Sequence, residues 1–169
     1  RYRYRLSKAL SREKNRFQSY AFLKCSDWKR VKAFSNILGA TSAALLTEFT
    51  VAELQEMTHD QLVDLIARRG RGRFDAPTAT AQAVRQALRT SYPIDLQMDE
   101  MVTAALAASW DHIRYLKRAT KRLDRLIGRY IDLVPNPIIT IKGLGAVITA
   151  GILAEVVDVL RFPEEKHLA

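Results

Sequence analysis

Cysteine is nearly absent from this sequence, and neither glycine nor proline forms a rich tract. The single thiol, Cys25, cannot form an internal disulfide or a cysteine-based zinc site, which is typical of a reducing compartment. Low-complexity stretches are also missing, and 48% of the 169 residues are hydrophobic. A chain of this kind can bury a core in one or two compact units, which excludes a disulfide scaffold and a disordered tail.

Long apolar runs are missing as well. The longest uncharged one, residues 143–154, is shorter than the roughly 18 residues that suggest a membrane span. The basic N-terminus is not followed by an apolar signal region. We therefore expect a cytoplasmic protein without a membrane partner. The chain does not begin with methionine, so we also expect it to be part of a longer protein.

Charge is distributed unevenly. Residues 1–35 hold eleven Lys and Arg against two acidic residues, a net charge of +9, whereas residues 36–169 hold sixteen of each sign. A basic segment of this kind is typical of a polyanion-binding surface, because each phosphate contact releases condensed counterions. The alternative is a solvated face that only confers solubility.

Residues 1–35 are predicted to form a basic N-terminal helix. Leu6, Leu10, Phe17 and Ala21 recur at helical spacing, and no glycine or proline precedes Gly39. The basic side chains that fall largely off this stripe are candidates for phosphate binding, and they are Arg3, Arg5, Lys8, Arg12 and Arg16. Tyr2 and Tyr4 either stack on bases or pack on a neighbouring helix.

Residues 36–94 are predicted to form several short helices. The sequences TVAE from Thr50 and THDQ from Thr58 both have the spacing of a capping box. Gly70 and Gly72 then interrupt a helix within the RGRGRF turn. This turn carries further phosphate-binding candidates, Arg69, Arg71 and Arg73, next to Arg68. Alternatively, these residues complement the dipole of the helix that ends there.

Residues 95–133 are predicted to form one long coiled-coil helix. Its apolar seam alternates steps of four and three residues and consists of Val102, Leu106, Ser109, Ile113, Leu116, Thr120, Leu123, Ile127 and Tyr130. The polar members Ser109 and Thr120 can specify the register. The helix should end before the sequence VPNP, where Pro135 and Pro137 cannot continue it. The seam pairs either within the chain or across a homodimer through residues 102–130, and we favour the dimer.

Residues 134–169 contain a pattern typical of a helix-hairpin-helix. Two short apolar helices are expected around Gly143-Leu144-Gly145, where the glycines allow a tight turn and Leu144 locks the helices together. Free amides at the start of the second helix can then hold a phosphate, which makes Lys142, Gly143 and Gly145 binding candidates. A plain helix-packing turn is the alternative.

No catalytic or metal-binding residue is expected in this chain. Asp95, Asp99 and Glu100 cluster, but at a helix start they more simply complement the dipole than bind Mg²⁺. His59, His112 and His167 have no cysteine or histidine partner at ligand spacing. The sequence thus predicts an all-α fold of short helices and one long coiled-coil helix, ending in a helix-hairpin-helix.

The last thirty residues resemble the start of the C-terminal domain of transposases of the insertion-sequence 110 (116/110/902) family. In that family, two glycines around an apolar residue precede a small-residue helix, an Ala-Glu pair and an Arg-Phe pair. The corresponding residues are Gly143, Leu144, Gly145, Ala154, Glu155, Arg161 and Phe162. The Arg-rich helix, the RGRGRF turn and the coiled coil are similar to the family's middle region, whereas Lys142 and Ala146 stand where the family often has proline.

The resemblance implies a fragment that binds nucleic acid and oligomerises within a DNA transposase. The family's catalytic carboxylates and serine match no position here, so catalysis and its Mg²⁺ would belong to the rest of the parent protein. The partners implied are DNA, at the element ends and the target, and in some members a structured guide RNA. Two alternatives stay open, a self-contained helix-hairpin-helix DNA-binding protein of the repair or junction type and a structural coiled-coil dimerisation module.

Overall fold

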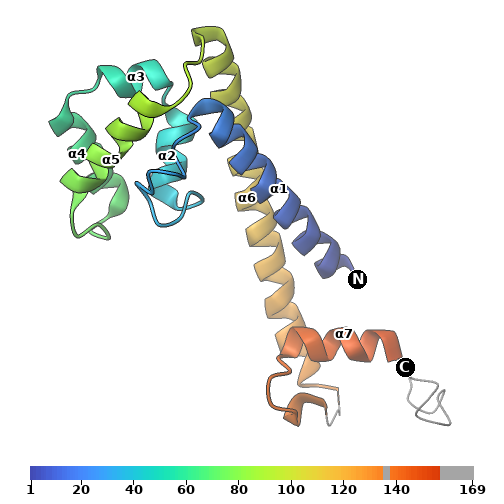
Figure 1. Ribbon diagram of the computed structural model, residues 1–169. Helices are drawn as coiled ribbons and strands as arrows, with labels where there is room; N and C mark the ends of the chain where they lie inside the picture. The colour runs from blue at the N-terminus through green and yellow to red at the C-terminus, as the bar shows by residue number, and fades with distance from the viewer. Residues whose placement is uncertain (135–137, 157–169) are drawn as a thin grey trace. The chain divides into compact units, whose positions relative to one another are not determined.

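The structure, a computed structural model, describes residues 1–134 and 138–156, and these residues form helices without strands (Figure 1). The predicted all-α class is confirmed. The elements are α1 (Tyr2–Lys24), α2 (Ala40–Glu48), α3 (Val51–Glu56), α4 (His59–Gly70), α5 (Pro77–Thr90), α6 (Leu96–Ile131), the 3-10 helix η1 (Ile138–Thr140) and α7 (Ala146–Val156). Within the described ranges, no helix is both long and apolar enough to cross a membrane.

The chain divides into two compact units. Unit 2 is Leu10–Tyr115, and unit 1 combines Arg1–Ala9 with the described part of Leu116–Ala169. The hydrophobic core of unit 2 takes residues from all six helices that pass through it. Its most deeply buried large members are Phe17, Leu45, Leu46, Leu54, Leu62, Ile66, Val84, Leu106 and Ile113. Within this unit α4 packs on both α5 and α2.

Both predicted capping boxes are present, and they fix where two short helices begin. The backbone N–H of Glu53 donates to Thr50 Oγ1 at 3.2 Å, and the Thr50 N–H donates to the Glu53 carboxylate at 2.7 Å. Thr58 and Gln61 make the same exchange at the start of α4. Each box satisfies amides that have no partner within the helix, so the local sequence contributes directly to both starts.

The N-terminal helix is shorter than predicted, since α1 ends at Lys24 rather than near residue 35. Tertiary contacts draw the following segment out of the helix. The indole N–H of Trp28 donates to Ser42 Oγ at 2.9 Å, and the Asp27 N–H donates to Ser91 Oγ at 3.0 Å. Burial of Trp28 and its hydrogen bond to Ser42 favour this turn over a continued helix.

The first half of the predicted coiled-coil seam pairs within the chain. In unit 2, Val102, Leu106, Ser109 and Ile113 are buried, and α1 runs antiparallel beside this part of α6. Ser109 Oγ donates to Glu13 Oε1 at 2.7 Å, and this polar seam residue therefore specifies the register between α1 and α6. The rings of Phe17 and Trp110 lie 5.7 Å apart in the same interface.

The second half of the seam lies in unit 1 and is less covered. Leu116 is buried, Thr120, Leu123 and Ile127 are half-buried, and Tyr130 is exposed. Thr120 Oγ1 has no hydrogen-bond partner among the described residues. As predicted, α6 ends before Val134, at Ile131, while Pro135 and Pro137 lie outside the described residues.

The predicted helix-hairpin-helix is only partly present. The second helix is found as α7, and Gly143 has the positive φ of 96° that the turn requires. The first helix is reduced to the single 3-10 turn of η1. Its sequence, Ile138 to Ile141, is entirely β-branched, and such residues lose side-chain freedom in a helix. Arg161 and Phe162 lie outside the described residues.

One buried ammonium group joins four helices of unit 2. Lys24, the last residue of α1, is 1% exposed, and its Nζ donates to the carbonyl oxygens of Leu46, at 2.9 Å, and Phe49. These carbonyls belong to the C-terminal end of α2, where no partner exists within the helix and the helix dipole favours a cation. On α6, Nζ also donates to Thr103 Oγ1 and lies 3.6 Å from Asp99 Oδ1.

Asp99 extends this network to α3. Its second oxygen, Oδ2, accepts from the N–H of Val51, the first residue of α3, at 2.5 Å. Asp99 is 2% exposed, so both charges are removed from water and depend on each other and on their hydrogen bonds. Asp99 therefore has a structural role, and Asp95 caps α6 by accepting from the Met98 N–H at 2.9 Å.

We predict that Lys24→Met lowers the free energy of unfolding by about 3 kcal/mol, because it leaves the Asp99 carboxylate buried without its counter-charge. The double variant Lys24→Met/Asp99→Asn should recover at least ~1 kcal/mol, since the asparagine oxygen still accepts from Val51. Urea unfolding followed by circular dichroism measures both. Arg114→Met, which removes an exposed pair with Asp111, is the control and should cost less than ~1 kcal/mol. Equal losses in Lys24→Met and the control would contradict the role of Lys24.

The same variants give a pH dependence. Burial lowers the pKa of Lys24 to about 8. The unfolded chain keeps this proton up to a pKa near 10.5, so unfolding takes up a proton above pH 8 and stability should rise with pH in that window. We expect the wild-type protein to gain roughly 2 kcal/mol over the double variant between pH 7.5 and 9.5. A pH-independent difference would show that burial does not shift Lys24.

Candidate nucleic-acid interface

The RGRGRF turn begins with an unusual helix end. α4 stops at Gly70, and the next residue, Arg71, takes the left-handed conformation, with φ 51° and ψ 47°. Its N–H closes the helix by donating to Ala67 O at 3.1 Å. Glycine is the usual residue at such a position because any Cβ costs energy there. Here the helix ends on an exposed arginine, and the following Gly72 also has a positive φ, of 73°.

A chain of aromatic rings anchors the end of this turn. A Cβ added at Gly70 would lie 2.3 Å from Cδ2 of Phe74, so the Phe74 ring folds back over Gly70 in space that only glycine leaves open. Phe74 meets Phe34 edge-on at 5.8 Å, and Phe34 stacks on Trp28 at the same distance. Because Trp28 is bonded to Ser42 on α2, the turn is held against α2 and the segment before it.

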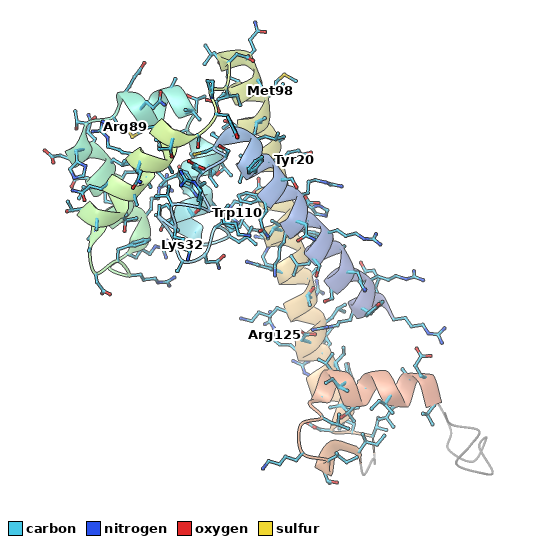
Figure 2. All side chains as sticks on the ribbon, viewed as in Figure 1. Tyr20, Lys32, Arg89, Met98, Trp110 and Arg125 are labelled. Carbon is cyan, nitrogen blue, oxygen red and sulfur yellow. The ribbon has the colours of Figure 1, made fainter. Side chains whose placement is uncertain are left out.

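These segments enclose an open groove of about 980 Å³, entirely within unit 2. We call it the basic groove. One wall is the RGRGRF turn, a second is the segment from Phe34 to the start of α2, and a third is α6 between Ala107 and Arg114. Five arginines line it, namely Arg68, Arg69, Arg71, Arg73 and Arg114. Figure 2 labels Trp110, which lines it from α6, and Lys32, in the segment between α1 and α2.

The basic groove keeps a net positive charge. Its lining contains two carboxylates, so the five arginines leave a formal charge of 5 − 2 = +3. Arg69 pairs with Glu48, and Arg114 lies 3.6 Å from Asp111. Among the described residues, no acidic side chain lies within ion-pair distance of Arg71 or Arg73, and both are exposed. These two guanidinium groups are the ones best able to bind an external anion.

The start of α2 adds backbone donors to the same lining. Its N-cap is Gly39, which supplies no side-chain acceptor for the amides of the first turn. A Cβ added at Gly39 would lie 2.9 Å from the backbone carbonyl oxygen of Asn36, so this close approach requires glycine. Amides at an uncapped helix start, next to several arginines, favour an anion such as a phosphate.

The structure brings together only some of the predicted binding residues. Arg69, Arg71 and Arg73 lie in the basic groove, as a cluster. On α1, the part in unit 2 carries Arg12, which is exposed, and Arg16, which pairs with the buried Glu13 at 3.1 Å. The basic residues of α1 are thus not all available, because some of them hold the fold.

In unit 1, too, some of the predicted binding residues are exposed and others are held in ion pairs. Arg3 makes a bidentate ion pair with Asp124, at 2.8 and 3.3 Å, whereas Arg5 is exposed. Lys8 is exposed and lies 5.4 Å from the centre of the Tyr4 ring. The tyrosine thus contacts a cation of its own helix, and Tyr2 and Tyr4 are both more than 60% exposed.

The turn before α7 contains the other predicted phosphate-binding residues. Lys142, Gly143 and Gly145 are exposed, and α7 begins with the Gly145 carbonyl accepting from the Ile148 and Thr149 N–H groups. Leu144 is half-buried, and the first of the two helices that it was predicted to lock together is only the 3-10 turn η1. Of the two predicted phosphate sites that depend on a glycine-containing turn, only the basic groove also has several arginines.

Comparison of the chain with protein-family models, with curated proteins and with solved structures finds no match. Among the described residues, no group of three or more His, Cys, Asp and Glu side chains is placed to hold a metal ion. The side chains and backbone of the basic groove offer guanidinium groups, aromatic rings and amides.

We predict that Arg71→Gly leaves the protein as stable as the wild type, or up to ~1 kcal/mol more stable, because glycine removes the cost of a Cβ in the left-handed conformation. Thermal and urea unfolding measure this. Arg68→Gly, at an exposed position inside α4, is the matched control and should lose about 0.5–1 kcal/mol. A loss of more than ~1 kcal/mol in Arg71→Gly would show that the Arg71 side chain supports the fold instead of serving a ligand.

Proposed function

We propose that this chain is a nucleic-acid-binding and oligomerisation segment of an insertion-sequence DNA transposase, whose catalytic residues lie outside it. The observation that carries the binding part is the basic groove, where arginines from α4, the RGRGRF turn and α6 line a single concave surface. The transposase part rests on the sequence resemblance. The partners would be DNA at the element ends and the target, or a structured guide RNA, in the cytoplasm.

Three features of the groove support a phosphate ligand over a passive basic surface. Its net charge is positive although two of its arginines are already paired. Arg71 occupies a position where glycine would fold at lower cost, and such local strain is commonly found at functional sites. The uncapped start of α2 contributes amide donors. Together these features provide directional donors as well as charge.

The exposed basic residues of α1 would add weaker phosphate contacts of their own. Arg5 and Arg12 are exposed and have no acidic partner within ion-pair distance among the described residues. Contacts of this kind bind the backbone of any sequence and position the protein without reading bases. Mg²⁺ would be required by the catalytic part of the parent protein and has no assigned residue here.

Binding should be salt-sensitive and should depend on the groove arginines. We predict that Arg71→Gly and Arg73→Ala each weaken binding to a labelled nucleic-acid hairpin. Each should also reduce the slope of log affinity against log salt by about 0.9 on duplex or 0.7 on single-stranded contacts. Fluorescence anisotropy at several salt concentrations measures this.

The matched control is Arg89→Ala, which removes the same charge from an exposed position on α5 outside the basic groove (Figure 2). It should change affinity little. If the wild-type chain bound no nucleic acid even at low salt, the structural coiled-coil module would be the better description. If the control and the groove variants weakened binding equally, only nonspecific charge would be involved.

We also propose a homodimer whose interface is the second half of the seam on α6. The first half is filled by α1 of the same chain, whereas Leu123, Ile127 and Tyr130 remain partly or largely exposed.

Leu123→Asp would place a charge in an apolar interface and should give monomers in sedimentation equilibrium. Circular dichroism should show that the helical content is retained. A wild-type chain that stays monomeric at high micromolar concentration would disprove the dimer.

A further inference from the structure

The basic groove has an aromatic side as well as a cationic one. Phe34, Phe74 and Trp110 line it together with the five arginines, and all three rings are half-buried. Binding the backbone of a duplex requires only cations, because its bases are stacked inside. Rings beside arginines are instead the combination found where proteins hold unpaired nucleotides, with bases stacked on the rings and phosphates on the arginines.

The size of the groove agrees with this ligand. A volume of about 980 Å³ is at the upper end of pockets that hold small ligands, roughly 300–1,000 Å³. It can admit a nucleotide turned out of a strand.

The rings are held in place before any ligand arrives. Phe34 is fixed between Trp28 and Phe74, and Trp110 lies against the buried Phe17. Phe74 in turn is seated over Gly70, so its position depends on a glycine in the neighbouring turn. Because these side chains are already ordered, stacking a base on them costs little further conformational entropy.

The arginines of the turn lie within the same short sequence as one of these rings. Arg73 immediately precedes Phe74, Arg71 lies three residues before it, and all three line the groove. Neighbouring phosphates of an extended strand would therefore meet the guanidinium groups while a base between them reaches Phe74. Glu48 and Asp111 are already paired with Arg69 and Arg114, which limits their repulsion of a phosphate.

We propose that the basic groove binds unpaired nucleotides of DNA or RNA by stacking at least one base on Phe74 and holding the flanking phosphates with Arg71 and Arg73. The proposal rests on the nucleic-acid-binding function above, and it specifies the form of nucleic acid that this surface selects.

The test compares three ligands of one sequence and length, namely single-stranded DNA, single-stranded RNA and blunt duplex DNA, with the full chain at one salt concentration. We expect at least one single strand to bind ten-fold or more tightly than the duplex. Phe74→Leu should weaken single-strand binding about ten-fold more than it weakens duplex binding. Phe22→Leu, which removes an exposed ring of α1 outside the groove, is the control and should change nothing.

A second measurement does not depend on the Phe74→Leu variant folding. A single strand carrying 2-aminopurine should lose fluorescence on binding to the wild-type protein, because stacking on an aromatic ring quenches this base, and Phe74→Trp should retain the effect. Duplex binding as tight as single-strand binding, or absence of quenching, would overturn the proposal while leaving the proposed function standing. Failure to bind any of the three ligands would overturn both. A difference between the DNA and RNA arms would identify the natural strand.

Discussion

The architecture of unit 2 depends on a single buried cation. The Lys24 ammonium group neutralises the carbonyl end of α2, contacts Asp99 and Thr103 on α6, and through Asp99 fixes the first amide of α3. Desolvation lowers the pKa of Lys24 to about 8, so burial by itself disfavours the charged form of this side chain. The hydrogen bonds of the ammonium group offset this desolvation cost, because they satisfy carbonyl groups at the end of α2 that would otherwise be buried without partners. Since α2 is fixed at its C-terminal end by Lys24, its N-terminal end has a defined place in the basic groove.

Local conformation and ligand chemistry are coupled in the RGRGRF turn. Gly70 leaves the space for Phe74, while the left-handed position that would suit glycine is occupied by Arg71. With arginine at position 70 and glycine at position 71, a side chain would fill the space of the Phe74 ring. The guanidinium group would also be removed from position 71. The arrangement therefore trades a small amount of stability for a cationic donor at a fixed point. The left-handed conformation of Arg71 is one of the observations on which the proposed binding role of this turn rests.

Patterns confined to a few neighbouring residues were predictable from the sequence. The capping boxes at Thr50 and Thr58, the break at Gly70 and the long helix of the heptad seam are confirmed, because each depends on local hydrogen bonds or periodicity. The end of α1 was not predictable, since it depends on Trp28 reaching Ser42. The groove was found only in part, because its arginines are adjacent in sequence whereas Phe34, Gly39 and Trp110 join them through tertiary packing. The ion pair of Asp99 with Lys24 was not predictable either, because the two residues are 75 positions apart in the sequence.

The hydrogen bond between Glu13 and Ser109 spans 96 residues of chain, and this separation matters during synthesis. A ribosome adding about 5–20 residues per second takes roughly 5–20 s to make the intervening segment. For that time α1 lacks the partner surface that α6 supplies, although α2 to α5 are made earlier, and its arginines are already outside the exit tunnel. The nascent helix is therefore most exposed to chaperones, and to stray RNA, before α6 emerges. Completion of α6 ends this period by covering Phe17 and engaging Glu13 in one step.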